Sequence, residues 1–529
     1  MISVNSMALL FIVLILFLMH IMKLKFWSIH NNGKCSAPTS PGPSPWPIIG
    51  CVPEMLRQKP TFRWIHRLMK EMDTNIACIR LGNVHVIPVT CPEIAREFLT
   101  KHDAKFSSRP PSMASRTCSG GYLTAILTPY GTQWKKMRRV LVSEIISPAR
   151  HRWLKDRRTE EADNLVKYIY NRSKSLSQTV NVRTATRQYT ANVTRQIMFS
   201  KRWFGEERAD GGPTVAEEEH VEAVYTILKY LFAFCISDYF PWLVGLDLDG
   251  HERLVKEAIS TVKKYHDPII DSRIGKWRRF GHSNEEPTSD EPHDLLDVLI
   301  TLKDSEGKPL LTLEEIKAQV TEIMFASIDN PANAVEWALA EMINQPEMLK
   351  TAMDELDRVV GKERLVQECD IPHLNYIKAC AREAFRLHPI RPFVPTHMAM
   401  SDAVVAGYFI PKGSHVLLSR PGLGRNPKVW NNPLEFRPER HLTSECTEVQ
   451  LTEPDLRFIS FSTGRRSCVA PLFGTAMTVM LLARMVQGFN WKAPRDVTSI
   501  NLDESIEDMF PVDPVIAHAE PRLPLHLYP

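Results

Sequence analysis

The first 22 residues contain no charged side chain, which sets them apart from the rest of the 529-residue chain. A helix of that length spans roughly 30 Å, about the hydrocarbon thickness of a membrane. Lys23, Lys25 and Lys34 follow the apolar segment, and this order predicts a lumenal N-terminus and a cytosolic C-terminal side. A cleaved signal peptide would carry its basic residues before the apolar segment and small residues after it. We therefore expect a retained membrane anchor over 1–22, with a signal peptide or a buried helix as the alternatives.

A proline-rich segment over 38–50 separates this start from the remaining chain. Closely spaced prolines disfavour a helix and give a stiff, extended backbone. No second linker of comparable strength follows, although length alone, at about 150 residues per domain, would suggest three or four domains. We predict three parts: a membrane anchor over 1–22, a basic and proline-rich hinge over 23–59, and one large domain over 60–529.

Composition excludes several classes of protein. With 44% hydrophobic and 24% charged residues, the chain is neither largely disordered nor a polytopic membrane protein. The formal net charge is only +4, so nothing indicates a nucleic-acid partner. Ten cysteines are spread along the chain without paired CxxC spacing, which argues against a disulfide scaffold or a zinc site. Most of them should be small buried residues.

Helical periodicity dominates the large domain. We predict a mainly α fold with small β-sheets (α+β). The expected helices cover 150–175, 214–235, 250–280, 312–345, 345–360, 372–387 and 468–486, and the expected strands lie near 76–90 and 403–418.

The longest helical signal begins at Thr312, where Glu315 completes a capping box, and it continues past Glu341. Pro331 lies inside it. A proline in a helix has no N–H to donate, so the carbonyl of Ser327 loses its usual partner. We expect the helix to open locally there, in a groove that can hold water or a diatomic ligand. A tolerated kink without function is the alternative.

One cysteine stands in a loop with several special positions, over 461–470. Its pattern is Phe-x-x-Gly-x-Arg-x-Cys-x-(Gly/Ala). Gly464 permits a tight turn, and Arg466 can pair with a haem propionate. Cys468 can supply a thiolate as axial iron ligand, stabilised by backbone N–H groups and the following helix N-terminus. Ala470 is small enough for a porphyrin to lie close. Thiolate ligation favours cleavage of the O–O bond.

With these residues the sequence resembles the cytochrome P-450 superfamily of haem-thiolate monooxygenases, over essentially the whole chain after the anchor. The resemblance implies the cytochrome P-450 fold with a single N-terminal transmembrane helix, and haem b (iron protoporphyrin IX) as cofactor. It also implies O2 as co-substrate, with electrons from NADPH relayed by NADPH-cytochrome P-450 reductase. The implied location is the endoplasmic reticulum membrane, single-pass, with the catalytic domain on the cytosolic side. Taken alone, the cysteine loop also fits a structural loop with a free thiol.

Two further matches concern the haem-binding core. Glu383 and Arg386 lie one helical turn apart, and with Arg440 they would form the family's buried ion network. A solvated surface pair is the alternative for this spacing. Trp134 and Arg138 match the family's Trp-x-x-x-Arg helix and would bind a propionate.

The helix that carries Trp134 and Arg138 also holds two basic residues that would not contact the haem. Lys135 and Arg139 would form a basic proximal surface for an acidic electron donor, unless they are merely a solvated helix face. Elsewhere in the chain, His397 keeps its family position and would reach a propionate.

The segment 326–331 occupies the place of the family's oxygen-activation motif. Asn330 stands where most members carry threonine, and a proline follows. An amide does not relay a proton as a hydroxyl does, so delivery would need ordered water, with Asp329 as the acid relay.

The Asp-Asn-Pro variant is characteristic of one plant branch, the amino-acid N-hydroxylating, aldoxime-forming cytochromes P-450. That branch implies that an L-amino acid is hydroxylated twice on its α-nitrogen, and that decarboxylation and dehydration then give an aldoxime for specialised metabolism. Other stretches resemble the same branch: 189–195, 202–205, 237–243, 246–252, 265–271 and 521–528.

The loop over 388–397 departs from that branch at Val394 and Thr396, and Arg391 is unusual. Our hypothesis is that the Arg391 guanidinium binds the substrate carboxylate, because a buried carboxylate needs a cationic partner. Surface solvation or a propionate contact are the alternatives. The first substrate-lining loop is expected within 110–129.

Two other functions fit the same resemblance. One is a plant cytochrome P-450 that hydroxylates carbon in a terpenoid, phenolic or fatty-acid substrate. The other is a reductase-independent haem-thiolate isomerase or dehydratase, which the Asn330 departure would permit and the basic helix face argues against.

Overall fold

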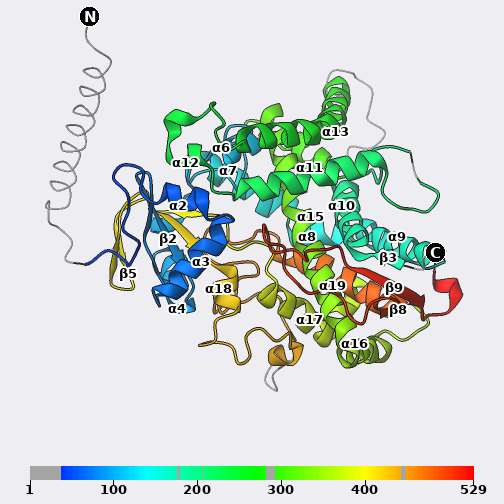
Figure 1. Cartoon of the computed structure of the whole chain (residues 1–529). Coiled ribbons are helices and arrows are strands. Elements are labelled where there is room, and N and C mark those ends of the chain that lie inside the picture. Colours follow the sequence, from blue (N-terminus) through cyan, green and yellow to red (C-terminus); the bar gives the residue numbers. More distant parts are fainter. Residues whose placement is uncertain (1–36, 175–178, 207, 281–291, 443–447, 529) are drawn as a thin grey trace, which may run out of the picture.

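The computed structural model describes residues 37–174, 179–206, 208–280, 292–442 and 448–528. The predicted anchor over 1–22 and the start of the predicted hinge lie outside the described residues. The described chain is mainly helical with small sheets, which confirms the predicted fold class (Figure 1).

The helices before the long central one cover the first part of the domain; η marks short 3-10 or π segments. Their bounds are α2 (Val52–Arg57), α3 (Thr61–Glu71), α4 (Pro92–Arg96), η1 (Glu97–Lys101), α5 (Asp103–Phe106), α6 (Met113–Cys118), α7 (Thr132–Val140), η2 (Leu141–Ile145), α8 (Pro148–Trp153), α9 (Lys155–Ser173), α10 (Val182–Phe199), α11 (Val215–Leu231), α12 (Ile236–Tyr239), η3 (Pro241–Leu243), α13 (His251–Phe280) and α14 (Leu295–Thr301).

The central helix and those after it build the second part. They are α15 (Leu313–Asn344), α16 (Pro346–Val359), η4 (Glu368–His373), α17 (Asn375–Leu387), α18 (Arg420–Gly424), η5 (Pro438–His441), α19 (Pro471–Gly488) and η6 (Leu525–Leu527).

Most of the predicted helices are confirmed, with ends shifted by a few residues: α11, α13, α15, α16, α17 and α19. The helix predicted over 150–175 is confirmed as α9, but it begins at Lys155, because the chain turns at Leu154 and the residues before it form the separate helix α8. The sequence analysis did not find α10. Nearly all of this helix is buried, including the polar residues Thr190, Asn192 and Arg195, so it lacks the polar face that reveals a helix in a sequence.

Three small sheets complete the fold. Their strands are β1 (Ile79–Leu81), β2 (Val84–Val89), β3 (Thr179–Asn181), β4 (His397–Met398), β5 (Ala403–Val405), β6 (Tyr408–Ile410), β7 (His415–Leu418), β8 (Phe489–Lys492) and β9 (Ile516–Pro521). The strands predicted near 76–90 and 403–418 are thereby confirmed. One sheet has the order β1-β2-β7-β4, with β2 and β7 parallel; a second has the order β3-β9-β8, and β5 pairs with β6.

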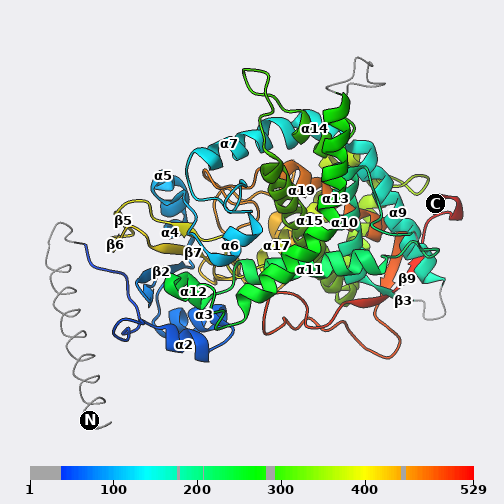
Figure 2. The same ribbon diagram turned by 90° about the horizontal axis from the view of Figure 1, so that it is seen from above.

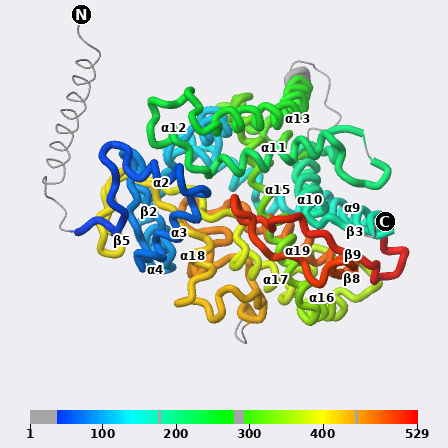
Figure 3. The backbone as a smooth tube through the Cα atoms, viewed as in Figure 1, coloured from blue at the N-terminus to red at the C-terminus, as the bar shows by residue number. Residues whose placement is uncertain are grey.

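The first two sheets lie at opposite ends of the molecule, with most of the helices between them (Figures 2 and 3). The described part of the predicted hinge packs onto the end that holds the four-stranded sheet. The N–H of Cys78 donates to the carbonyl of Pro41 at 2.7 Å, and Gly50 bridges to Leu81. Residues 38–50 contain no helix, as their prolines predict, whereas Met55 of α2 is buried in the core.

The central helix α15 confirms the predicted capping box. The hydroxyl of Thr312 accepts from the N–H of Glu315, and the Glu315 carboxylate accepts from the N–H of Thr312. The helix packs against α10, α11, α13, α16, α17 and α19. Because it is covered on nearly all sides, most of its side chains are buried, and Pro331 lies inside it without ending it.

Among the described residues, one stretch is long and apolar enough to cross a membrane, Val215–Tyr239, which includes α11 and α12. Val224 and Ile227 of α11 are fully buried in a cluster that also contains Val255 of α13 and Ile328 of α15. This packing accounts for the apolar character of α11.

Candidate functional site

A cavity of about 310 Å³ lies between α15, the segment 389–397 and the cysteine loop. It brings together residues that the sequence analysis selected from distant motifs: Trp134, Arg138, Asp329, Asn330, Arg391, His397, Arg466 and Cys468. Glu383, Arg386 and Arg440 are not among its lining residues. The cavity is therefore the candidate site, and the ion network supports it from outside.

Cys468 stands just before α19, and its side chain is exposed because it faces the cavity. Its N–H donates to the carbonyl of Phe461 at 2.9 Å, and the N–H of Ala470 donates to its Sγ at 3.3 Å. Desolvation raises the pKa of the thiol, while the Ala470 amide and the charges of Arg138 and Arg420 lower it. These donors and cations would favour a thiolate once it binds a metal.

Gly464 shapes the loop, as predicted. Its φ is +78°, and a Cβ at this position would come within 2.5 Å of the Leu99 carbonyl oxygen. A side chain there would therefore move the loop that carries the cysteine.

Arg466 belongs to a group of basic side chains at the cavity, which we call the cationic cluster: Arg109, Arg138, His397 and Arg466. Arg138 is half-buried, and burial lowers the pKa of His397 well below its ordinary value, so the positive charge of the cluster comes from the three arginines. The Arg466 guanidinium donates to the carbonyls of Ser107 at 2.5 Å and Thr128 at 2.9 Å. Burial lowers the pKa of Arg466 to about 9, and the nearby charge of Arg138 adds to this effect. Glu322 acts on Arg466 from a distance, but within the described residues no carboxylate forms an ion pair with it.

The other cluster members are likewise bonded to carbonyl oxygens. Arg138 donates to Ser467 at 3.2 Å, Arg109 donates to Thr396 at 3.0 Å, and His397 bonds to Phe106 at 2.9 Å. Burial lowers the pKa of Arg109 well below its ordinary value, and Arg466 contributes. Among the described residues these three arginines have no carboxylate in an ion pair, and the indole N–H of Trp134 beside them is buried and unpartnered. Such an arrangement fits a ligand with two carboxylates. Haem, with its two propionates, is such a ligand.

The sequence analysis did not identify Arg109. It follows two serines in a segment without a recognisable catalytic pattern, and its partners at Pro395 and Thr396 are nearly 290 residues away in sequence.

Opposite charges meet on the α15 side of the cavity. Arg391 donates to Oδ2 of Asp329 at 3.0 Å, and both side chains are buried. The other carboxylate oxygen of Asp329 has no hydrogen-bond partner. Burial raises the pKa of Asp329, and the charge of Arg391 opposes that rise. Arg391 is therefore buried and paired with Asp329, and it is not a solvated surface residue.

Asn330 follows Asp329 and is exposed in the wall of the cavity. The hydroxyl of Ser327, one turn earlier, donates to the carbonyl of Ile323 at 2.8 Å and bonds to the Thr194 hydroxyl at 2.9 Å. This segment therefore presents an amide and a carboxylate to the cavity without breaking α15.

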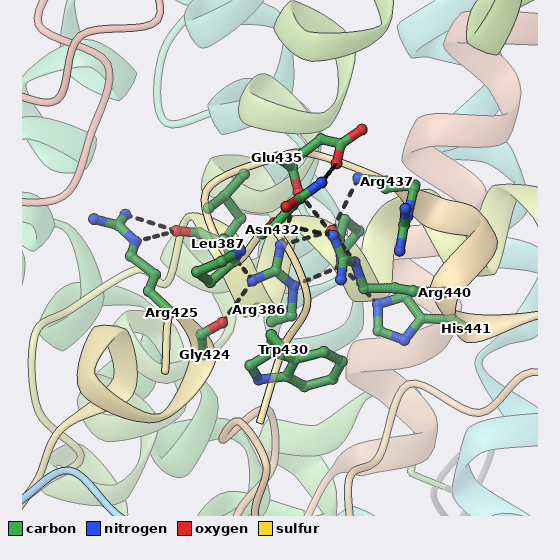
Figure 4. Close-up of polar contacts among 12 residues, drawn as sticks. Arg386, Leu387, Gly424, Arg425, Trp430, Asn432, Glu435, Arg437, Arg440 and His441 are labelled. Atoms are coloured by element: carbon green, nitrogen blue, oxygen red, sulfur yellow. Dashed lines mark hydrogen bonds and ion pairs between the residues drawn. The ribbon is translucent and has the colours of Figure 1, made fainter. Parts of the chain in front are cut away.

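The predicted ion network is buried, and Figure 4 shows three of its members, Arg386, Arg440 and His441. Arg386 donates to both carboxylate oxygens of Glu383, at 2.7 and 2.8 Å, and Arg440 donates at 2.9 Å. His441 adds a bond of 2.8 Å that the sequence analysis did not assign, although it follows Arg440 directly. Burial raises the pKa of Glu383, but the bonds from Arg386 and His441 outweigh it and bring it to about 2.

The basic residues predicted for a docking face have the expected exposure. Lys135 and Arg139 are exposed on α7, while Trp134 on the same helix is buried. Lys136 points elsewhere, because it pairs with Glu315 of α15 at 2.8 Å.

Glu322 is a buried carboxylate that sequence analysis did not single out. It accepts the backbone N–H groups of Ala125, Ile126 and Leu127, at 2.9 to 3.2 Å. Ala125 and Ile126 line the cavity, within the predicted substrate loop over 110–129. Glu322 therefore fixes one wall of the site to α15.

Comparison with known proteins agrees with this geometry. The family model for cytochrome P450 matches residues 40–514. The chain is 60% identical to tyrosine N-monooxygenase of Sorghum bicolor, over 94% of this chain and 88% of that protein. It is 56% identical to valine N-monooxygenase 1 of Manihot esculenta, over 100% and 96%. It is 55% identical to isoleucine N-monooxygenase 1 of Lotus japonicus, over 98% and 96%. With a thiol, a cluster of unpaired cations and the α15 segment around one cavity, the chain belongs to the cytochrome P450 family.

Proposed function

We propose that this protein is a monooxygenase that hydroxylates the α-nitrogen of an L-amino acid twice and yields an aldoxime after decarboxylation and dehydration. One observation carries the proposal. Relatives at 54 to 60% identity are named for N-oxidation of tyrosine, valine, tryptophan, phenylalanine and isoleucine. These amino acids share only the α-amino acid group, so a site common to them must recognise that group.

The residues around the cavity suit haem b as the cofactor. Cys468 would ligate the iron, and the cationic cluster with Trp134 would hold the propionates. Bound haem supplies the activation of O2. The cluster would keep the propionates ionised inside the protein, because its buried charges then gain the partners that they lack.

The protein's own part is to hold the amino acid and to move protons. Oδ1 of Asp329 is free to exchange a proton in the cavity, while Arg391 fixes Oδ2. The Asn330 amide can orient water through hydrogen bonds but does not take up a proton. We propose Asp329 as the acid relay and Asn330 as the group that places its water.

The same proposal includes a partner and a location. Electrons would come from NADPH through NADPH-cytochrome P-450 reductase, which would dock at Lys135 and Arg139 by charge complementarity. The anchor over 1–22 would hold the protein in the endoplasmic reticulum membrane. The hinge over 23–59 would join it to the catalytic domain over 60–529 on the cytosolic side.

Two measurements test the proposal. The carbon-monoxide difference spectrum of the reduced protein should show a band at about 450 nm, and Cys468→Ser should abolish it. Incubation with reductase, NADPH and a panel of amino acids, followed by mass spectrometry, should yield an aldoxime. NADPH-dependent oxidation of a compound that is not an amino acid would instead indicate a carbon hydroxylase. Conversion without NADPH would indicate an isomerase or dehydratase.

A further inference from the structure

Arg420 is a second arginine near Asp329 that no motif in the sequence reveals. It follows β7 at the start of α18, and its N–H donates to the carbonyl of Pro392 at 2.9 Å. Its side chain lines the cavity beside Arg391 and Asp329.

Among the described residues Arg420 forms no ion pair, unlike its neighbour Arg391. Arg391 is paired with Asp329 at 3.0 Å, whereas within the described part of the chain the Arg420 guanidinium makes no hydrogen bond, and its Nε is buried. Burial lowers the pKa of Arg420 to about 10, and the charge of Arg391 adds to this effect. Arg420 is half-buried, and a partly desolvated guanidinium without an ion pair is costly, so this position fits an anionic ligand.

The propionates are accounted for elsewhere. The cationic cluster already offers three guanidinium groups; Arg138 acts on Arg466, and Arg466 acts on Arg109. Arg420 shares one neighbour with that cluster, because its charge acts on Cys468 as that of Arg138 does. Its other charged neighbours are Arg391 and Asp329, which places Arg420 on the side of the cavity where this pair lies.

We propose that Arg420 binds the α-carboxylate of the amino-acid substrate, while the free Oδ1 of Asp329 faces its amino group. This assignment rests on the proposed function and names a binding residue for it. Arg391, which the sequence analysis gave this role, positions Asp329 instead. Arg420 is the cation available to the substrate, because Arg391 is already paired with Asp329.

The charges at this position suit an amino acid. Arg420 and Arg391 are cations and Asp329 is an anion; Arg187 and Asp508 also act on Asp329, and Cys468 acts on Arg420. A guanidinium favours the ionised carboxylate of the substrate, and the Asp329 carboxylate would accept the proton that its ammonium group must lose. Hydroxylation of nitrogen needs the lone pair that the neutral amine has.

Binding to the haem-loaded enzyme tests the proposal without turnover. Difference spectra in the haem band give the affinity of wild type, Arg420→Gln and Arg420→Lys for five amino acids and for the corresponding amides. The amino acids are L-tyrosine, L-valine, L-tryptophan, L-phenylalanine and L-isoleucine. The amides keep the side chain and the amine but lack the negative charge. Lys412→Gln, an exposed cation before β7, is the matched control.

We expect Arg420→Gln to weaken binding of the amino acids by about 30-fold or more, with little change for the amides. Arg420→Lys should recover part of the loss, and Lys412→Gln should match wild type. Retained haem content and an unchanged band at about 450 nm support substrate binding rather than a haem contact.

Three outcomes would overturn the assignment. Equal weakening of amino acids and amides, or lost haem, would place Arg420 at the cofactor. Unchanged amino-acid affinity in Arg420→Gln would contradict the role of Arg420 and leave the proposed function intact. A wild-type enzyme that binds none of the five amino acids would contradict both the role of Arg420 and the proposed function.

Discussion

At the scale of single residues, the proposed relay at Asp329 depends on its pairing with Arg391. Arg391→Gln removes the cation that holds down the pKa of Asp329, so that pKa should rise. Arg187 and Asp508 also act on Asp329 and remain in the variant. An ionised Asp329 would then require a higher pH. We expect the acid limb of the pH profile of aldoxime formation to move upward by the same amount, measured between pH 6 and 9.

Asp329→Asn is the control for this shift, since an amide does not titrate and the acid limb due to Asp329 should disappear. If the acid limb of Arg391→Gln coincides with that of wild type, Asp329 is not the group that sets it.

At the scale of elements, Glu322 joins α15 to the cavity wall at Ala125 to Leu127. Glu322→Gln replaces one of two accepting oxygens by a donor, which leaves buried N–H groups without a partner. We expect the free energy of unfolding to fall by about 1–3 kcal/mol and the amino-acid affinity to weaken. Urea unfolding followed by circular dichroism measures the first, and difference spectra measure the second.

Glu314→Gln is the matched control, because Glu314 lies on the same helix and is exposed. It should change the unfolding free energy by less than about 0.5 kcal/mol. Equal effects of both variants would mean that Glu322 does not hold the wall.

At the scale of the whole molecule, the Glu383 network joins α17 to the segment around η5. It should make the free energy of unfolding depend on pH in the acid range. The pKa of Glu383 is about 2 in the folded chain and 4.5 ordinarily. A depressed pKa gives stability that is present above pH 4.5 and is lost as pH falls toward 2. By linkage this contribution is about 3 kcal/mol. Unfolding free energies between pH 6 and 3 should fall in wild type, and this part of the slope should be absent in Glu383→Gln.

His441→Gln tests the same network if Glu383→Gln does not fold. It keeps the Glu383 carboxylate and removes one of its donors, so the pKa of Glu383 should rise. The loss of stability on acidification should then begin at a higher pH. An acid transition that is identical in wild type and His441→Gln would contradict the contribution of this histidine.

Much of the site could be predicted because its residues lie in short patterns. The turn at Gly464, the cysteine four residues later and the pair of Glu383 and Arg386 depend on local spacing, and the structure places them as expected. Arg109, Arg420 and Glu322 could not be predicted in this way. Each acts on residues of other motifs, and Glu322 reaches partners almost 200 residues away.

The sequence by itself determined the helical class, the capped central helix, the cysteine loop and the family, because these follow from periodicity and from fixed local spacing. Only the tertiary structure decided which cations have partners. Arg391 and Asp329 are 62 residues apart in sequence, and their pairing leaves the neighbouring Arg420 without an ion pair among the described residues. Charge compensation depends on distances in space and on burial, and neither is written in the order of the residues.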